Sequence, residues 1–156
     1  MLLRARKMNR KITELQSQLE LLSQQHPNRE GFAEAHSYLG LHLSLAKELK
    51  KTSPSRAIEH YKLAESCQSS IGTFATGSGE GLASMGALYE IMADRAELEE
   101  RLAYKSKRTK DRIQHLQEAL KIWKEIKADP NLDDLLPQKN IEPLEEQLAA
   151  WIGESS

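Results

Sequence analysis

Similar helical patterns recur along the chain, and this repetition constrains the fold more than any other feature of the sequence. Ile12, Ile58 and Ile113 each begin a stretch with a second apolar residue three positions later. Two glycines, Gly40 and Gly86, stand in matching helical contexts 46 residues apart, and Ile12 and Ile58 have the same separation. A glycine inside a helix costs roughly 1 kcal/mol relative to alanine. We therefore expect a neighbouring helix to approach the backbone closely at both glycines.

Turn-forming residues divide the chain into helical segments. Proline or glycine stands among small polar residues at 26–28, 52–55, 72–81 and 129–131. Pro54 is placed to occupy the first turn of a helix, where its missing N–H costs nothing. With 156 residues, of which 39% are hydrophobic and only 5% aromatic, the chain is expected to form a single all-α domain. The pattern predicts a leading helix at 9–25, a helical pair at 31–71, an enlarged pair at 80–128 and a final helix at 142–152.

Each predicted pair carries an apolar residue followed by glycine on its first helix, and small and aromatic residues on its second. The first pair has Leu39-Gly40 with Leu43, then Ala57, Tyr61 and Ala64; the second has Met85-Gly86 with Tyr89, then Ala119, Trp123 and Ile126. These residues resemble the tetratricopeptide repeat (TPR), although the spacing exceeds that family's period of about 34 residues. The resemblance implies antiparallel helical hairpins stacked as a short solenoid of about five to six helices, closed by a C-terminal capping helix.

By this resemblance, the chain is an adaptor or regulatory module that binds another protein on its concave face, without catalysis and without a cofactor. The implied groove residues are Glu34, Ser37, Leu41, Ser44 and Leu45 in the first pair, and Ala83, Ala87, Glu90 and Ile91 in the second. These positions lack the Lys and Asn with which some TPR domains hold a C-terminal carboxylate. We therefore expect an amphipathic helix or a mixed basic and apolar segment as the ligand.

A run of basic residues offers a second kind of site. It consists of Lys105, Lys107, Arg108, Lys110 and Arg112, interrupted among charged residues only by Asp111. Such a patch suits phosphates, RNA or an anionic membrane. The segment 30–35 followed by 39–46, together with this run, also resembles the BAR region of sorting nexins, a dimeric helical membrane module. That resemblance implies a homodimer on anionic membrane and needs helices longer than Pro27, Pro54 and the glycines at 72–81 favour.

Chemistry-bearing residues are few, and we expect neither a catalytic site nor a metal site. Glu97, Glu99 and Glu100 are predicted to form a solvated helix face. The histidines have no metal-binding spacing, and His60 and His115 are predicted to lie on the repeat surface. The third class considered, an all-helical enzyme, would need a nucleophile beside a base, and no spacing predicts one.

The remaining features indicate a soluble, cytoplasmic protein. The single cysteine, Cys67, cannot form an intramolecular disulfide and is predicted to be a buried thiol in a reducing compartment. The basic start of the chain lacks the apolar segment of a secretory signal. A net charge of −1 provides no overall attraction to nucleic acid or to an anionic membrane. Either of these could bind only through a local basic patch.

Overall fold

The structure, a computed structural model, describes residues 1–28, 31–74, 79–130 and 139–156. Six α-helices account for most of them, and these described ranges contain no β-strand, so the all-α prediction is confirmed. The helices are α1 (Leu2–Gln25), α2 (Phe32–Leu49), α3 (Pro54–Phe74), α4 (Gly79–Lys105), α5 (Thr109–Ala128) and α6 (Glu142–Ser155). None of the helices, over the residues described, combines the length and hydropathy that crossing a bilayer requires.

The helix boundaries follow the turn signals closely. Pro54 begins α3, as its missing N–H predicts. Three boundaries differ from expectation. Helix α1 begins at Leu2 rather than at residue 9, and α6 ends at Ser155 rather than at residue 152. Helix α3 runs to Phe74, so that Gly72 belongs to a helix rather than to a loop. The basic run spans the break between α4 and α5, whose ends are Lys105 and Thr109.

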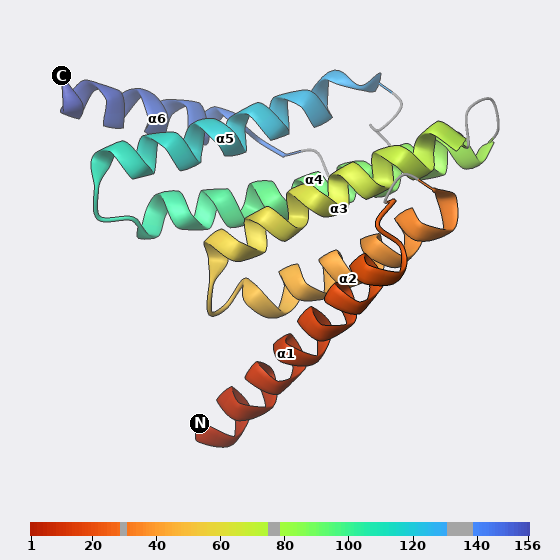
Figure 1. Cartoon of the computed structure of the whole chain (residues 1–156). Helices are drawn as coiled ribbons and strands as arrows, with labels where there is room; N and C mark the ends of the chain where they lie inside the picture. The colour runs from red at the N-terminus through yellow and green to blue at the C-terminus, as the bar shows by residue number, and fades with distance from the viewer. Residues whose placement is uncertain (29–30, 75–78, 131–138) are drawn as a thin grey trace. The chain divides into compact units, whose positions relative to one another are not determined.

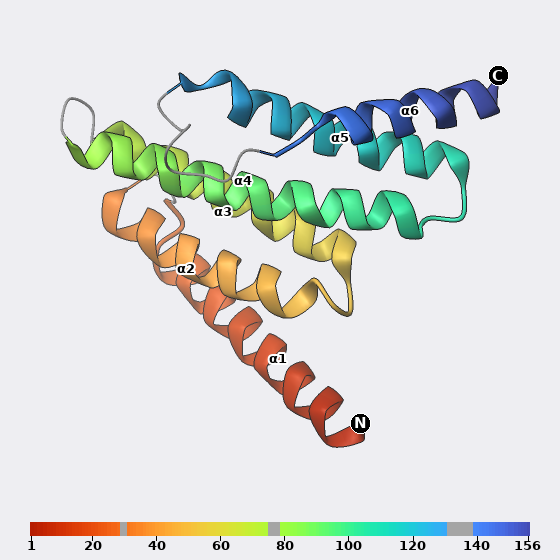
Figure 2. The same ribbon diagram turned by 180° about the vertical axis from the view of Figure 1, so that it is seen from behind.

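The chain divides into two compact units, Met1–Leu88 and Tyr89–Ser156, and α4 contributes residues to both. In the first unit α1 packs against α2, and α2 packs along α3 (Figure 1). In the second unit α5 packs against α6, and both views show these two helices side by side (Figure 2). The expectation of one domain stays a prediction.

Apolar side chains from neighbouring helices fill the first unit. The second-helix motif of the first predicted pair lies in this core, because Ala57, Tyr61 and Ala64 are buried. Hydrogen bonds from the Gln68 amide to the Ser84 hydroxyl (2.8 Å) and carbonyl (3.4 Å) join α3 to the first part of α4. The largest fully buried side chains here are those of Tyr38, His42, Leu45, Leu49 and Tyr61.

The second unit buries the corresponding motif of the enlarged pair. Ala119, Trp123 and Ile126 of α5 are buried, and α6 adds Leu144 and Trp151. Burying large apolar side chains of this kind contributes about 1.5–3 kcal/mol each relative to leaving them in water. The predicted helical patterns of α3 and α5 therefore report correctly which face of each helix is buried.

The close approach expected at Gly40 is wrong. Gly40 is exposed, and a Cβ atom added there would meet nothing within 4 Å. Met85, the apolar residue of the matching motif on α4, is also exposed. The apolar-glycine motif therefore does not mark a tight helix crossing at Gly40, because α2 turns a different face toward its neighbours.

Candidate functional site

Helix α2 divides into a core face and a flank that reaches solvent. The core face carries Ala35, Tyr38, His42, Leu45, Ala46 and Leu49, at the spacing of one helical stripe. Beside it, Ser37 is exposed, while Glu34, Leu41 and Ser44 are half-buried. We call these four residues the α2 flank. Leu41 gives it an apolar centre between two serines, and Glu34 places a carboxylate at one end.

Helix α1 borders the α2 flank. Lys11 Nζ lies 2.8 Å from Glu48 Oε1, and Glu48 follows Ser44 by one helical turn. At the other end of the contact, the Tyr38 hydroxyl donates to the His26 carbonyl over 2.7 Å. These two contacts fix α1 antiparallel to α2. Leu41 and Ser44 lie between the two contacts along α2, whereas Glu34 and Ser37 precede the Tyr38 contact.

The other predicted groove residues have mixed positions. Leu45 is buried, so it is a core residue and not a surface for a partner; Ile91, in the second unit, is buried as well. Ala87 is half-buried and Glu90 is exposed. The side chain of Ala83 lies outside the described residues. The part of the predicted groove that the structure places together on accessible surface is thus the α2 flank.

Two histidines meet between α2 and α3. The Nδ1 atoms of His42 and His60 are 3.0 Å apart, so one ring donates and the other accepts. Burial lowers the pKa of His60 below its usual 6.5; Arg56 lowers it further, and Glu59 acts in the opposite direction. His60 is therefore half-buried and paired rather than a surface residue as predicted. Across the described residues, no three His, Cys, Asp or Glu side chains gather as metal ligands.

Two adjacent carboxylates of α4 are held inside the second unit. Glu99 is only 4% exposed, and its Oε2 lies 2.6 Å from His115 Nδ1 of α5. The solvated face predicted for this stretch is therefore wrong at Glu99 and at the half-buried Glu100, although Glu97 is exposed as expected. A signal for this burial exists in the sequence, because Glu99 shares a helical face with Ala96 and Ala103, both fully buried.

The neighbouring carboxylate, Glu100, accepts two hydrogen bonds. Trp123 Nε1 donates to Oε2 over 2.8 Å, and Lys139 Nζ donates to Oε1 over 3.0 Å. The Lys139 ammonium also lies 5.3 Å from the centre of the Trp123 ring. Because both oxygens are engaged, Glu100 ties α5 and the segment before α6 to α4.

The basic run lies at the α4–α5 turn. Lys105, Lys107, Arg108 and Lys110 are exposed and form no ion pair with any residue that the structure describes. Arg112 differs, because its Nε donates to the Ser106 carbonyl and its guanidinium lies 5.8 Å from the centre of the Trp151 ring. Arg112 is therefore a packing residue, and the accessible basic patch consists of the other four cations.

Cys67 is buried, as predicted. Comparison with known proteins adds no further assignment: no protein-family model, no curated protein and no solved structure matches the chain significantly.

Proposed function

We propose that the chain is a non-catalytic adaptor built from TPR-like helical pairs, and that its α2 flank binds a peptide or an amphipathic helix of another protein. The proposal depends on one observation: on the side of α2 beside the core stripe, Leu41 is only half-buried between Ser37 and Ser44. An apolar centre with polar neighbours is the composition that a helix-in-groove contact uses.

The chemistry of the flank favours a ligand with basic and apolar residues. Glu34 supplies a carboxylate at one end, and Leu41 supplies apolar contact. Lys11 of α1 pairs with Glu48, which lies one turn beyond Ser44 at the other end of the same face. This pair is an example, within the chain, of a basic residue from another helix binding a carboxylate on this face. The single cysteine of the chain cannot form an intramolecular disulfide, which fits a reducing compartment, and we propose that the interaction takes place in the cytoplasm.

The family resemblance supports the proposal less than the surface does. Ala57, Tyr61 and Ala64 are buried as the second helix of a TPR pair requires, whereas Gly40 departs from the family pattern. For this reason the decisive experiment addresses the α2 flank directly.

The experiment compares two substitutions on α2 that add the same charge to different faces. Leu41→Arg alters the flank, and Gly40→Arg places the same side chain where a Cβ meets open space. The full chain, with a photo-cross-linking amino acid in place of Ser37, is used to capture partners from the native cell extract. We expect Leu41→Arg to lower the captured amount at least about tenfold, as for a central interface residue, and Gly40→Arg to leave it unchanged. Equal capture by both variants would remove the α2 flank as the binding site.

The alternative is a BAR-like dimer that binds anionic membrane through the basic patch. The observation in its favour is that Lys105, Lys107, Arg108 and Lys110 are exposed together at one turn. Each such cation contributes about 1 kcal/mol near an anionic lipid surface. A paired substitution of Lys107 and Arg108 tests this alternative in the vesicle experiment described below.

A further inference from the structure

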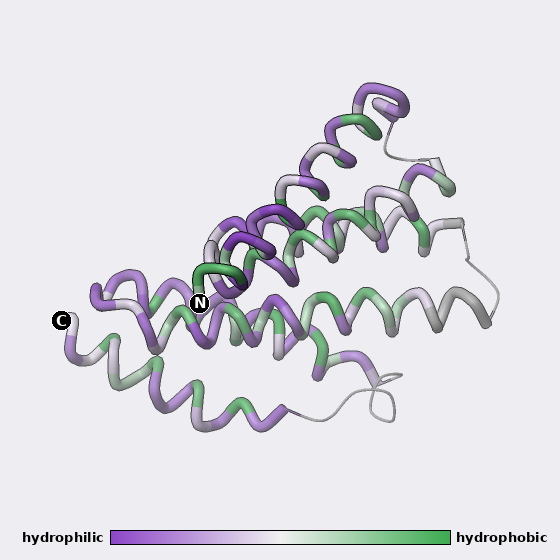
Figure 3. Tube along the Cα trace, turned by 90° about the horizontal axis from the view of Figure 1, so that it is seen from below, coloured by the Kyte–Doolittle hydropathy of each residue, from purple (hydrophilic) through white to green (hydrophobic). Residues whose placement is uncertain are grey.

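The first turns of α1 form a helix that packs against nothing in the described structure. Every residue from 1 to 7 is exposed, and the first buried residue of α1 is Ile12. Met1 is fully exposed, and Leu2 and Leu3 are 77% and 85% exposed. In Figure 3 the start of α1 is hydrophobic and the turns that follow are hydrophilic. Isolated helices this short are marginal in water, so an unpacked segment of this kind gains stability from a surface that covers it.

This segment is also strongly cationic. Arg4, Arg6, Lys7, Arg10 and Lys11 precede the first carboxylate of the chain, Glu14. We call residues 1–11 the basic arm. No acidic residue lies in the first turn of α1, so these cations stand at the end of the helix where the backbone dipole is already positive. An anionic surface would relieve that repulsion.

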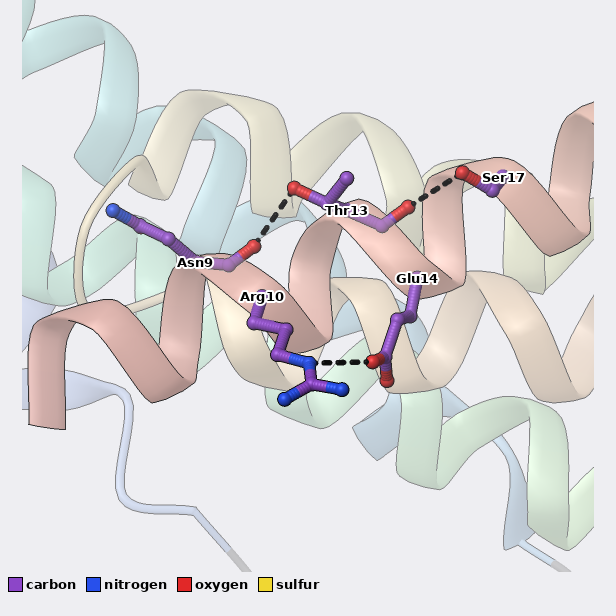
Figure 4. Close-up of polar contacts among 5 residues, drawn as sticks. All are labelled: Asn9, Arg10, Thr13, Glu14 and Ser17. Carbon is purple, nitrogen blue, oxygen red and sulfur yellow. Dashed lines mark hydrogen bonds and ion pairs between the residues drawn. The ribbon is translucent and has the colours of Figure 1, made fainter.

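Two of the five cations already have partners. Arg10 Nε lies 3.1 Å from Glu14 Oε1 (Figure 4). Lys11 Nζ contacts Glu48 of α2. Arg4, Arg6 and Lys7 form no ion pair within the described parts of the chain. Leu3 lines one shallow depression with Arg4, Arg6, Lys7 and Arg10. The same stretch of helix therefore presents unpaired positive charge and exposed leucine side by side.

We propose that the basic arm binds the surface of an anionic phospholipid membrane. Lysine and arginine beside leucine on a helix is the composition of helices that lie in the headgroup region, where apolar side chains enter the acyl boundary and cations contact lipid phosphates. A nucleic acid would neutralise the same charges but would leave Leu2 and Leu3 in water. The leucines thus favour lipid over nucleic acid as the polyanion.

The test uses the full chain in co-sedimentation with vesicles of phosphatidylcholine, with and without about one third phosphatidylserine. We expect binding only to the anionic vesicles, and weaker binding at high salt. Replacing Arg4, Arg6 and Lys7 together by Gln should lower partitioning roughly a hundredfold, since each cation contributes about fivefold. Leu2→Ser with Leu3→Ser should lower partitioning while leaving all the charges in place. Circular dichroism should show unchanged folding, because these residues are unpacked.

The matched control is Lys107→Gln with Arg108→Gln, which removes two cations from the α4–α5 turn and should leave binding nearly intact. Loss of binding in this control but not in the arm variant would overturn the proposal and favour the BAR-like alternative. Absence of binding to anionic vesicles, or equal binding to neutral ones, would also overturn it. Tighter binding of the basic arm to a single-stranded oligonucleotide than to vesicles would overturn the proposal as well. Self-association of the chain without lipid, if the arm substitutions abolish it, would also overturn it. None of these outcomes depends on the α2 flank, so the adaptor proposal stands or falls separately.

Discussion

Gly40 shows how a single residue can be mistaken for a packing requirement. Its position inside α2 costs helix stability, and a Cβ there would meet open space. Gly72 of α3 contrasts with it, because a Cβ at that position would come within 3.3 Å of the Ser84 hydroxyl oxygen. Ser84 in turn accepts the hydrogen bond from Gln68. Of these two helical glycines, only Gly72 thus has a neighbour at contact distance.

Gly40→Ala should therefore stabilise the protein by roughly 0.5–1 kcal/mol, through the lower conformational entropy of the unfolded chain and the better helix propensity of alanine. The measurement is urea unfolding followed by circular dichroism. Gly72→Ala is the comparison variant and should gain less or lose stability, because Ser84 has to shift. If Gly40→Ala instead lowers the free energy of unfolding, a neighbouring helix does approach Gly40 closely, as the sequence suggested.

At the scale of the helices, the apolar spacing within a single helix correctly predicts which of its residues are buried. Pro54 begins α3 as predicted, and Ala57, Tyr61 and Ala64 are buried. The position of Gly40 does not predict which face of α2 is buried, because that face is determined by the packing of α1 and α3 against α2. The sequence predicts only part of the α2 flank correctly for the same reason. Leu41 is half-buried, but Leu45, one turn further, belongs to the core.

The histidine pair between α2 and α3 should make stability depend on pH. Burial and Arg56 lower the pKa of folded His60, so the folded state favours the neutral ring. Above the unfolded pKa of 6.5 both states are neutral and the stabilisation is complete. As pH falls below 6.5 toward the lowered folded pKa, the unfolded chain takes up the proton first, and stability decreases.

Urea unfolding at about pH 7.5 and about pH 5.5 measures this effect. The protein should be less stable at the lower pH, and His60→Gln, whose amide can still pair with His42, should reduce the difference. His36→Gln, at an exposed position of α2, should retain it. An identical pH dependence in the His60 variant and the unaltered chain would show that other groups are responsible.

At the scale of the whole chain, the two compact units differ in what fixes their helices. The first unit joins α1 to α2 by the Lys11–Glu48 pair near the surface and by the hydroxyl of the buried Tyr38, which donates to the His26 carbonyl. The second unit places the buried Glu99 against His115. Buried carboxylates are rare without a partner, and composition alone could not distinguish Glu99 from the exposed Glu97. Both tryptophans, Trp123 and Trp151, belong to the second unit, so their fluorescence reports on that unit alone.

Glu99→Ala should lower the stability of the second unit by about 1–3 kcal/mol, because His115 loses its partner and the vacated space lies in the core. Glu97→Ala removes the same side chain from an exposed position of the same helix and should change stability by no more than about 0.5 kcal/mol. Tryptophan fluorescence during urea unfolding measures both variants. Equal effects would contradict a stabilising role for the buried pair.

His115→Ala completes a double-mutant cycle with Glu99→Ala. We expect its effect to exceed that of Glu99→Ala, since it leaves the carboxylate buried without its partner, whereas Glu99→Ala leaves a half-exposed ring that water can reach.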